Sequence, residues 1–183
     1  MSHNLIEILS SIKDPRRGAG QRHNLVVVLL IVIMSTVNGY YGYRAMGDFV
    51  IRNKRDLIKQ LKLKKKRLPS FSTIRRVIMS IDFNELSDGF LIWSKKYVKI
   101  EQGEWLNIDG KGINGTVSDM HSSKQNFINL VSVFAEKRGM VLFAGKVVNA
   151  KESEIPMVRK AIKVLDIEGA VFTLDALHCQ KKL

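Results

Sequence analysis

The sequence contains little cysteine, proline or tryptophan: one, three and two residues among 183. The single cysteine, Cys179, excludes an internal disulfide and, without a signal-like N-terminal segment, is typical of a protein from a reducing cytoplasm. The longest strongly apolar run, Leu25–Val37, has 13 residues, whereas crossing the hydrocarbon of a membrane takes about 20. We therefore expect a buried helix here and no membrane contact. A membrane-associated helix is the less favoured alternative.

Acidic residues are scarce in the first half of the chain. Residues 1–100 contain 19 Lys and Arg against 7 Asp and Glu, a net charge of +12, whereas residues 101–183 contain 11 against 10, a net charge of +1. A basic segment joined to a nearly neutral one is typical of a polyanion-binding module attached to a second domain. The alternative is that the excess charge serves only solubility.

Apolar spacing predicts a helical first domain over residues 1–100. Leu5, Ile8, Leu9 and Ile12 recur at helical spacing, and the apolar run Leu25–Val37 is typical of a buried helix. A further helix is expected over Tyr43–Leu61, another after a capping Ser70 or Ser72, and a last one near Asn84–Lys99.

After Glu101 the pattern changes to short apolar runs typical of strands. The runs are "EWLNID", "FINLVSVFA", "MVLFAGKVV" and "AVFTLDA", and an amphipathic helix marked by Ile155, Val158, Ile162 and Leu165 precedes the last of them. The order β-β-β-α-β predicts a mixed α/β layer over residues 101–183, with a crossover to the last strand. We expect an α+β protein whose domain border lies between Lys99 and Trp105.

Two acids end predicted strands: Asp109 in "WLNIDGKG" and Asp175 in "VFTLDALHC". If the two strands are neighbours, both carboxylates meet at one edge of the sheet. Hard divalent cations such as Mg²⁺ prefer oxygen ligands and share them with substrate phosphates, so the pair is a candidate site for phosphoryl transfer. The alternative is that both acids are solvated or cap turns at strand ends.

Five segments occur in the order found in one family of proteins: "DPRRGAGQRHNL", "LPSFSTIRRVI", "IDGKG", "KESEI" and "GAVFTLDALHCQ". Together they resemble the H-repeat-associated branch of the insertion-sequence DDE transposases. The first two resemble the accessory N-terminal domain of that family. The other three resemble its catalytic domain, which has an RNase H-like fold.

The resemblance implies roles for individual residues. Asp109 resembles the first acid of the DDE set and Asp175 the second, which together would hold Mg²⁺ or Mn²⁺ during DNA strand cleavage and transfer. The third acid, a Glu, is expected well downstream of the second, and no acid follows Asp175 here. We therefore expect a truncated transposase that is inactive alone and oligomerises through exposed strand edges. Glu154 resembles an auxiliary metal ligand, although an acid there would also stabilise the first turn of a helix.

Basic residues in the first half are the candidates for DNA contact. They are Lys64, Lys65, Lys66 and Arg67 in a loop and Arg75 and Arg76 on the following helix, with Lys111 near Asp109 as a further phosphate contact. The expected partner is the DNA of the element's terminal repeats, together with further copies of the chain. The alternatives are a merely solvated basic face and a noncatalytic DNA-binding protein, such as a repressor, that needs only the basic half.

Overall fold

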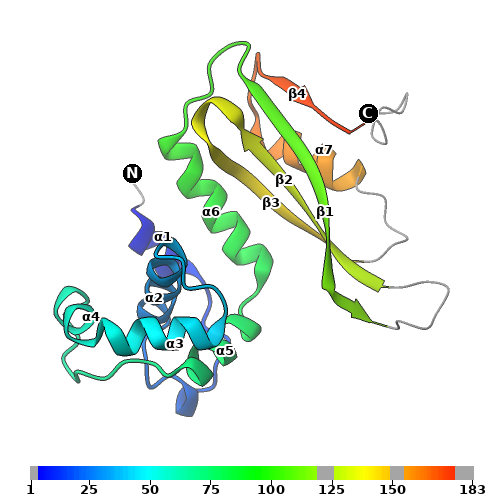
Figure 1. Ribbon diagram of the computed structural model, residues 1–183. Helices are drawn as coiled ribbons and strands as arrows, with labels where there is room; N and C mark the ends of the chain where they lie inside the picture. The colour runs from blue at the N-terminus through cyan, green and yellow to red at the C-terminus, as the bar shows by residue number, and fades with distance from the viewer. Residues whose placement is uncertain (1–3, 119–125, 149–154, 176–183) are drawn as a thin grey trace. The chain divides into compact units, whose positions relative to one another are not determined.

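The computed structural model describes residues 4–118, 126–148 and 155–175 (Figure 1). The chain forms two compact units, and the division between them falls between Leu86 and Ser87. We refer to these as the N-terminal unit and the C-terminal unit. This division describes how residues cluster in space. The predicted border between Lys99 and Trp105 separates two domains that would each fold independently, and it stays a prediction.

The N-terminal unit is built from short helices. They are α1 (Leu5–Ser11), the 3-10 helix η1 (Gly18–Gly20), α2 (Leu25–Val37), α3 (Tyr43–Arg52), α4 (Lys54–Gln60), α5 (Phe71–Ser80) and the start of α6 (Phe83–Tyr97). Side chains cap several of them, because the first N–H groups of a helix have no partner within it. Asn24 accepts a hydrogen bond from the Val26 N–H at 2.8 Å, and Ser70 accepts one from Thr73.

Helix α2 forms the centre of the N-terminal unit. Its side chains Val28 and Ile31 are fully buried and belong to one apolar cluster with Ile74 and Val77 of α5. The predicted buried helix over Leu25–Val37 is confirmed with these bounds. Over the residues that the structure describes, no helix combines the length and the apolar character that a membrane crossing requires.

The single helix predicted over Tyr43–Leu61 is wrong, because two helices meet at Asn53. This residue ends α3 and precedes α4, with φ −102° and ψ 19°. Its side-chain amide and its backbone N–H both donate to the carbonyl oxygen of Phe49, at 2.9 and 3.0 Å. The backbone bond is the regular bond of a helix, whereas the side-chain bond competes with the backbone for the same carbonyl. The apolar spacing continues through this position although α3 ends there.

The C-terminal unit contains a mixed four-stranded sheet in the order β3-β2-β1-β4. Strands β1 (Trp105–Ser118), β2 (Asn126–Ala135) and β3 (Met140–Val148) pair antiparallel, with the 3-10 helix η2 (Glu136–Arg138) between the last two. After helix α7 (Ile155–Leu165), β4 (Val171–Thr173) pairs parallel with β1. The predicted α+β class and the order β-β-β-α-β are confirmed.

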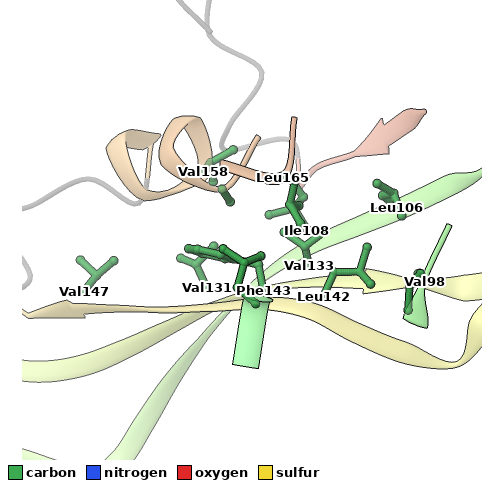
Figure 2. Packing of buried hydrophobic residues seen from close by; sticks show 13 residues of the cluster. Val98, Leu106, Ile108, Val131, Val133, Leu142, Phe143, Val147, Val158 and Leu165 are labelled. Carbon is green, nitrogen blue, oxygen red and sulfur yellow. The ribbon is translucent and has the colours of Figure 1, made fainter. Parts of the chain in front are cut away.

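One face of this sheet carries the core of the C-terminal unit. Val131 and Val133 of β2 are buried together with Val158 and Leu165 of α7, as Figure 2 shows. Residues of α6 belong to the same cluster, and the hydroxyl of Ser94 donates to the carbonyl of Leu142 on β3 at 3.2 Å. Since strand side chains alternate between faces, the positions between the buried ones point away from this core.

Candidate functional site

The two candidate acids lie beyond a pair of directly bonded parallel strands. In the register of β1 and β4, Asn107 is opposite Thr173. Asp109 comes two residues later within β1, and Asp175 comes two residues after Thr173, the last residue of β4. The prediction that Asp109 ends its strand is wrong, because β1 continues to Ser118 in its pairing with β2. Parallel strands run in the same direction, so both acids lie at the same end of the β1–β4 pair. The predicted neighbourhood of the two strands is therefore present.

Burial shows that the two acids also lie on one face. Leu106 and Ile108 on β1 are buried in the core cluster, and Phe172 and Leu174 pack against the same cluster. Asp109, next to Ile108 on β1, therefore faces away from this cluster. The exposed Asp175, which follows Leu174 just beyond the end of β4, continues the same alternation of burial. Both carboxylates are exposed.

A side-chain hydrogen bond joins the two strands next to the acids. The hydroxyl of Thr173 donates to Oδ1 of Asn107 at 2.6 Å, in a partly buried position. Neighbouring strands lie about 4.8 Å apart, so this bond fixes the register from which both acids project. Lys111, the next β1 residue on this face, is exposed and adds a cation beside them.

Glu154, the predicted auxiliary ligand, lies outside the described residues. Within the ranges that the structure describes, no group of three or more His, Cys, Asp and Glu side chains is arranged to hold a metal ion. The geometry accordingly supplies two carboxylates and no further protein ligand from this part of the chain. The assignment of Asp109 and Asp175 as catalytic metal ligands stays a prediction.

A second site lies in the N-terminal unit, where a groove of about 1180 Å³ is lined by selected residues between Arg16 and Val77. We call it the basic groove, because seven cationic side chains and one acid, Asp48, line it. The cationic residues are Arg16, Arg22, Arg44, Lys54, Lys66, Arg67 and Arg76. Such an excess of one charge in a concave surface attracts polyanions.

The loop before α2 holds one edge of the basic groove in shape. Nε and Nη2 of Arg16 donate to the two carboxylate oxygens of Asp14, at 2.8 and 2.7 Å. Nη2 also donates to the carbonyl of His23 at 2.9 Å, and the side-chain amide of Gln21 donates to the carbonyl of Arg16 at 2.9 Å. These contacts explain the "DPRRGAGQRH" segment as a closed loop that presents Arg22.

Two pKa values report the charge around this loop. The hydrogen bond from Arg16 is the largest cause that lowers the pKa of Asp14 below its usual value. The pKa of His23 is lowered first by burial and then by the nearby charges of Arg22, Arg16 and Arg67. Burial and the positive field of these cations both disfavour a further positive charge on His23. The lowered pKa therefore favours the neutral imidazole.

The structure separates the predicted DNA-contacting residues into three places. Lys66, Arg67 and Arg76 line the basic groove. Lys64, Lys65 and Arg75 are exposed but do not line it, and Lys111 is in the C-terminal unit. The sequence analysis did not predict Arg22, Arg44 and Lys54 as contacts, because they are single charges far apart in the sequence. The one available signal was the segment "DPRRGAGQRHNL", which contains Arg22. DNA contact by any of these residues stays a prediction.

Comparison with known proteins defines the class. Residues 6–94 match the family described as DDE_Tnp_1-associated. The protein is thus transposase-related, as the sequence segments predicted.

Among its relatives is "Putative transposase YncI" of Escherichia coli O157:H7, which is 28% identical over 98% of this chain and 45% of that protein. "H repeat-associated putative transposase YhhI" of Escherichia coli K12 is 27% identical over 98% of this chain and 46% of the relative. "H repeat-associated putative transposase YbfD" of the same strain is 29% identical over 98% and 69%, respectively. The chain thus spans less than half the length of the first two of these relatives. No solved structure matches the chain.

Proposed function

We propose that this chain supplies part of a metal-dependent site for the cleavage and transfer of DNA strands, with Asp109 and Asp175 holding a divalent cation. The observation that carries the proposal is the parallel register of β1 and β4, since two exposed carboxylates follow the same end of this pairing. Relatives that bear the name transposase support the choice of DNA as substrate. We also infer an RNase H-like sheet, for which the strand order β3-β2-β1-β4 is the support.

The residues present fit a magnesium or manganese ion. Mg²⁺ retains several waters and is often held by only one or two carboxylates together with substrate phosphates. Asp109 and Asp175 supply hard oxygen ligands and are open to solvent, so a phosphodiester can approach them. When bound, such an ion lowers the pKa of a water or 3′-hydroxyl and stabilises the leaving oxygen of an in-line displacement.

The remaining residues of the site would position the two carboxylates and neutralise the charge of a bound phosphate. The hydrogen bond between Thr173 and Asn107 holds the strands from which both carboxylates project. Lys111 lies on the same face as Asp109, and its ammonium group would neutralise a phosphate oxygen of the bound strand. Neither role requires a residue from the N-terminal unit.

Titration of the chain with Mn²⁺, followed by electron paramagnetic resonance of the free ion, tests the proposal. We expect Asp109→Asn and Asp175→Asn each to weaken Mn²⁺ binding about tenfold or more, because each removes a charged ligand. Glu168→Gln is the matched control, since Glu168 is an exposed acid of the same unit outside the site. Equal Mn²⁺ affinity in all of these variants would contradict the metal site.

The second candidate is a noncatalytic DNA-binding protein, and the observation that favours it is the basic groove. It predicts DNA binding that is unchanged by loss of both aspartates, together with no specific Mn²⁺ site. Whether this chain cuts DNA by itself is a separate question. Nicking of terminal-repeat DNA in the presence of Mg²⁺ measures it, and light scattering measures the expected self-association.

A further inference from the structure

The basic groove combines exposed cations with a rigid apolar floor. Six of its cations are exposed: Arg22, Arg44, Lys54, Lys66, Arg67 and Arg76. Beneath them Val50, Pro69 and Val77 are buried, and Phe71 lines the groove with a ring that is 49% exposed. Packed core residues therefore form the floor of the groove, and the cations surround it.

These cations are available for a ligand. Among the described residues, no ion pair involves Arg22, Arg44 or Lys54, and none involves Lys66 or Arg67. Arg76 donates through Nε to the carbonyl of Ser72 at 3.3 Å, a contact that leaves its two terminal nitrogens for other acceptors. Asp48 is the one acid in the lining. The concentration of positive charge therefore exceeds what the protein itself neutralises.

Five separate segments contribute these cations, with Lys54 coming from α4. Arg22 comes from the loop before α2, Arg44 from α3, Lys66 and Arg67 from the loop before α5, and Arg76 from α5 itself. A surface that is merely solvated needs no such convergence, whereas a polymer of phosphates needs cations spread along its path. Arginine side chains donate in pairs to phosphate oxygens, and an exposed aromatic ring can contact sugars or bases.

We propose that the basic groove binds the phosphodiester backbone of DNA, with Arg44 and Arg76 as principal contacts and with Lys64, Lys65 and Arg75 outside the binding surface. The proposal takes only its choice of DNA from the proposed function and needs no metal ion. Arg16 is a positioning residue, because its guanidinium is already held by Asp14 and the carbonyl of His23.

Fluorescence anisotropy with a labelled 20-base-pair duplex tests this, using the full chain in EDTA so that the metal site cannot contribute. We expect the double variant Arg44→Gln/Arg76→Gln to weaken binding at 50 mM salt about tenfold or more, since each lost charge-assisted hydrogen bond contributes a substantial factor. The slope of log K against log salt should become shallower by about 2, because each phosphate contact with duplex DNA contributes about 0.9.

The control Arg52→Gln/Arg55→Gln removes the same charge from exposed residues that do not line the groove. We expect its affinity to stay within about twofold of the unmodified chain. Equal losses in both double variants would overturn the proposal in favour of diffuse attraction, and no loss in the first would overturn it outright. Tighter binding of an RNA of the same sequence would overturn the assignment to DNA.

Two further measurements keep the outcomes distinguishable. If Arg44→Gln/Arg76→Gln does not fold by circular dichroism, the two single variants are measured instead, each with an expected shallowing of the salt slope by about 1. The variant Asp109→Asn/Asp175→Asn should bind the duplex as tightly as the unmodified chain in EDTA. Failure of the metal site would thus leave the groove result intact, and failure of the groove would leave the Mn²⁺ titration intact.

Discussion

Helices α3 and α5 approach each other closely at Gly47, which lies on α3 and lines the basic groove. A Cβ added there would lie 2.7 Å from Cβ of Phe71 and 3.5 Å from its Cα. Carbon atoms in contact normally stay about 3.5–4.0 Å apart. Because Cβ of Phe71 is attached directly to the backbone, no rotation of its ring relieves the overlap. The substitution Gly47→Ala must therefore displace the start of α5 by about 1 Å.

We expect Gly47→Ala to lower the free energy of unfolding by about 1–2 kcal/mol. Overpacking costs about 1–3 kcal/mol, and the need to move backbone puts Gly47→Ala in the upper part of that range. Replacing glycine by alanine inside a helix returns about 1 kcal/mol. For a chain of this length, the loss corresponds to a melting temperature lower by about 2–8 °C. Urea titration followed by circular dichroism measures the free energy, and a thermal melt measures the temperature.

Gly18→Ala is the matched control for this measurement. A Cβ at Gly18 would meet no atom within 4 Å, so we expect stability to be unchanged or higher by about 0.4–1 kcal/mol. A Gly47→Ala variant as stable as the unmodified chain would refute the reasoning, because it would mean that α3 and α5 do not pack at this distance.

Three further predictions concern single side chains. Ile74→Ala should lower the free energy of unfolding by about 2–5 kcal/mol in urea titration, because Ile74 is fully buried in the N-terminal core; a loss below 1 kcal/mol would contradict that burial. Thr173→Val should lower the free energy of unfolding by about 0.5–1.5 kcal/mol and weaken Mn²⁺ binding, since it removes the hydrogen bond to Asn107. Unchanged Mn²⁺ affinity would show that this hydrogen bond is not needed for the metal site. Above pH about 4, the unmodified chain should melt at a higher temperature than Asp14→Asn, because the charged Asp14 pairs with Arg16. This difference in melting temperature should disappear as the pH falls through the lowered pKa of folded Asp14. A difference that does not depend on pH would exclude the ion pair as its cause.

The bounds of a helix in the N-terminal unit were predictable where the helix lies within the apolar core. The run Leu25–Val37 became α2 with unchanged bounds, because every turn of this helix has an apolar face to bury and a capping Asn24 precedes it. The break at Asn53 was not predictable from spacing, since residues on both sides continue the same apolar period. It coincides with the hydrogen bond from the side-chain amide of Asn53 to the carbonyl of Phe49. Such local competition is not visible in hydrophobic periodicity.

The basic groove was only partly predictable, for a similar reason. A run of charges such as Lys64–Arg67 is conspicuous in the sequence, yet only its second half lines the groove. Arg44 and Lys54 are single charges on α3 and α4 that the packing of helices brings to the same hollow. Convergence of residues from distant segments is a property of tertiary structure. Sequence density of charge therefore identified the unit that contains the basic groove but not the set of side chains that lines it.

The pairing of β1 with β4 is the step on which the candidate metal site depends. The sequence places an acid after a short apolar run in each segment, but it does not determine where the strands end, whether they are neighbours or in which register they pair. A shift of one residue in β4 would turn Asp175 toward the core and Leu174 toward solvent, because side chains alternate between the faces. Phe172 and Leu174 pack against the same cluster as Leu106, and the bond from Thr173 to Asn107 forms only in the observed register. The apolar core and this hydrogen bond therefore act together to place both carboxylates on one face, so residues that never touch a metal ion decide whether the site can exist.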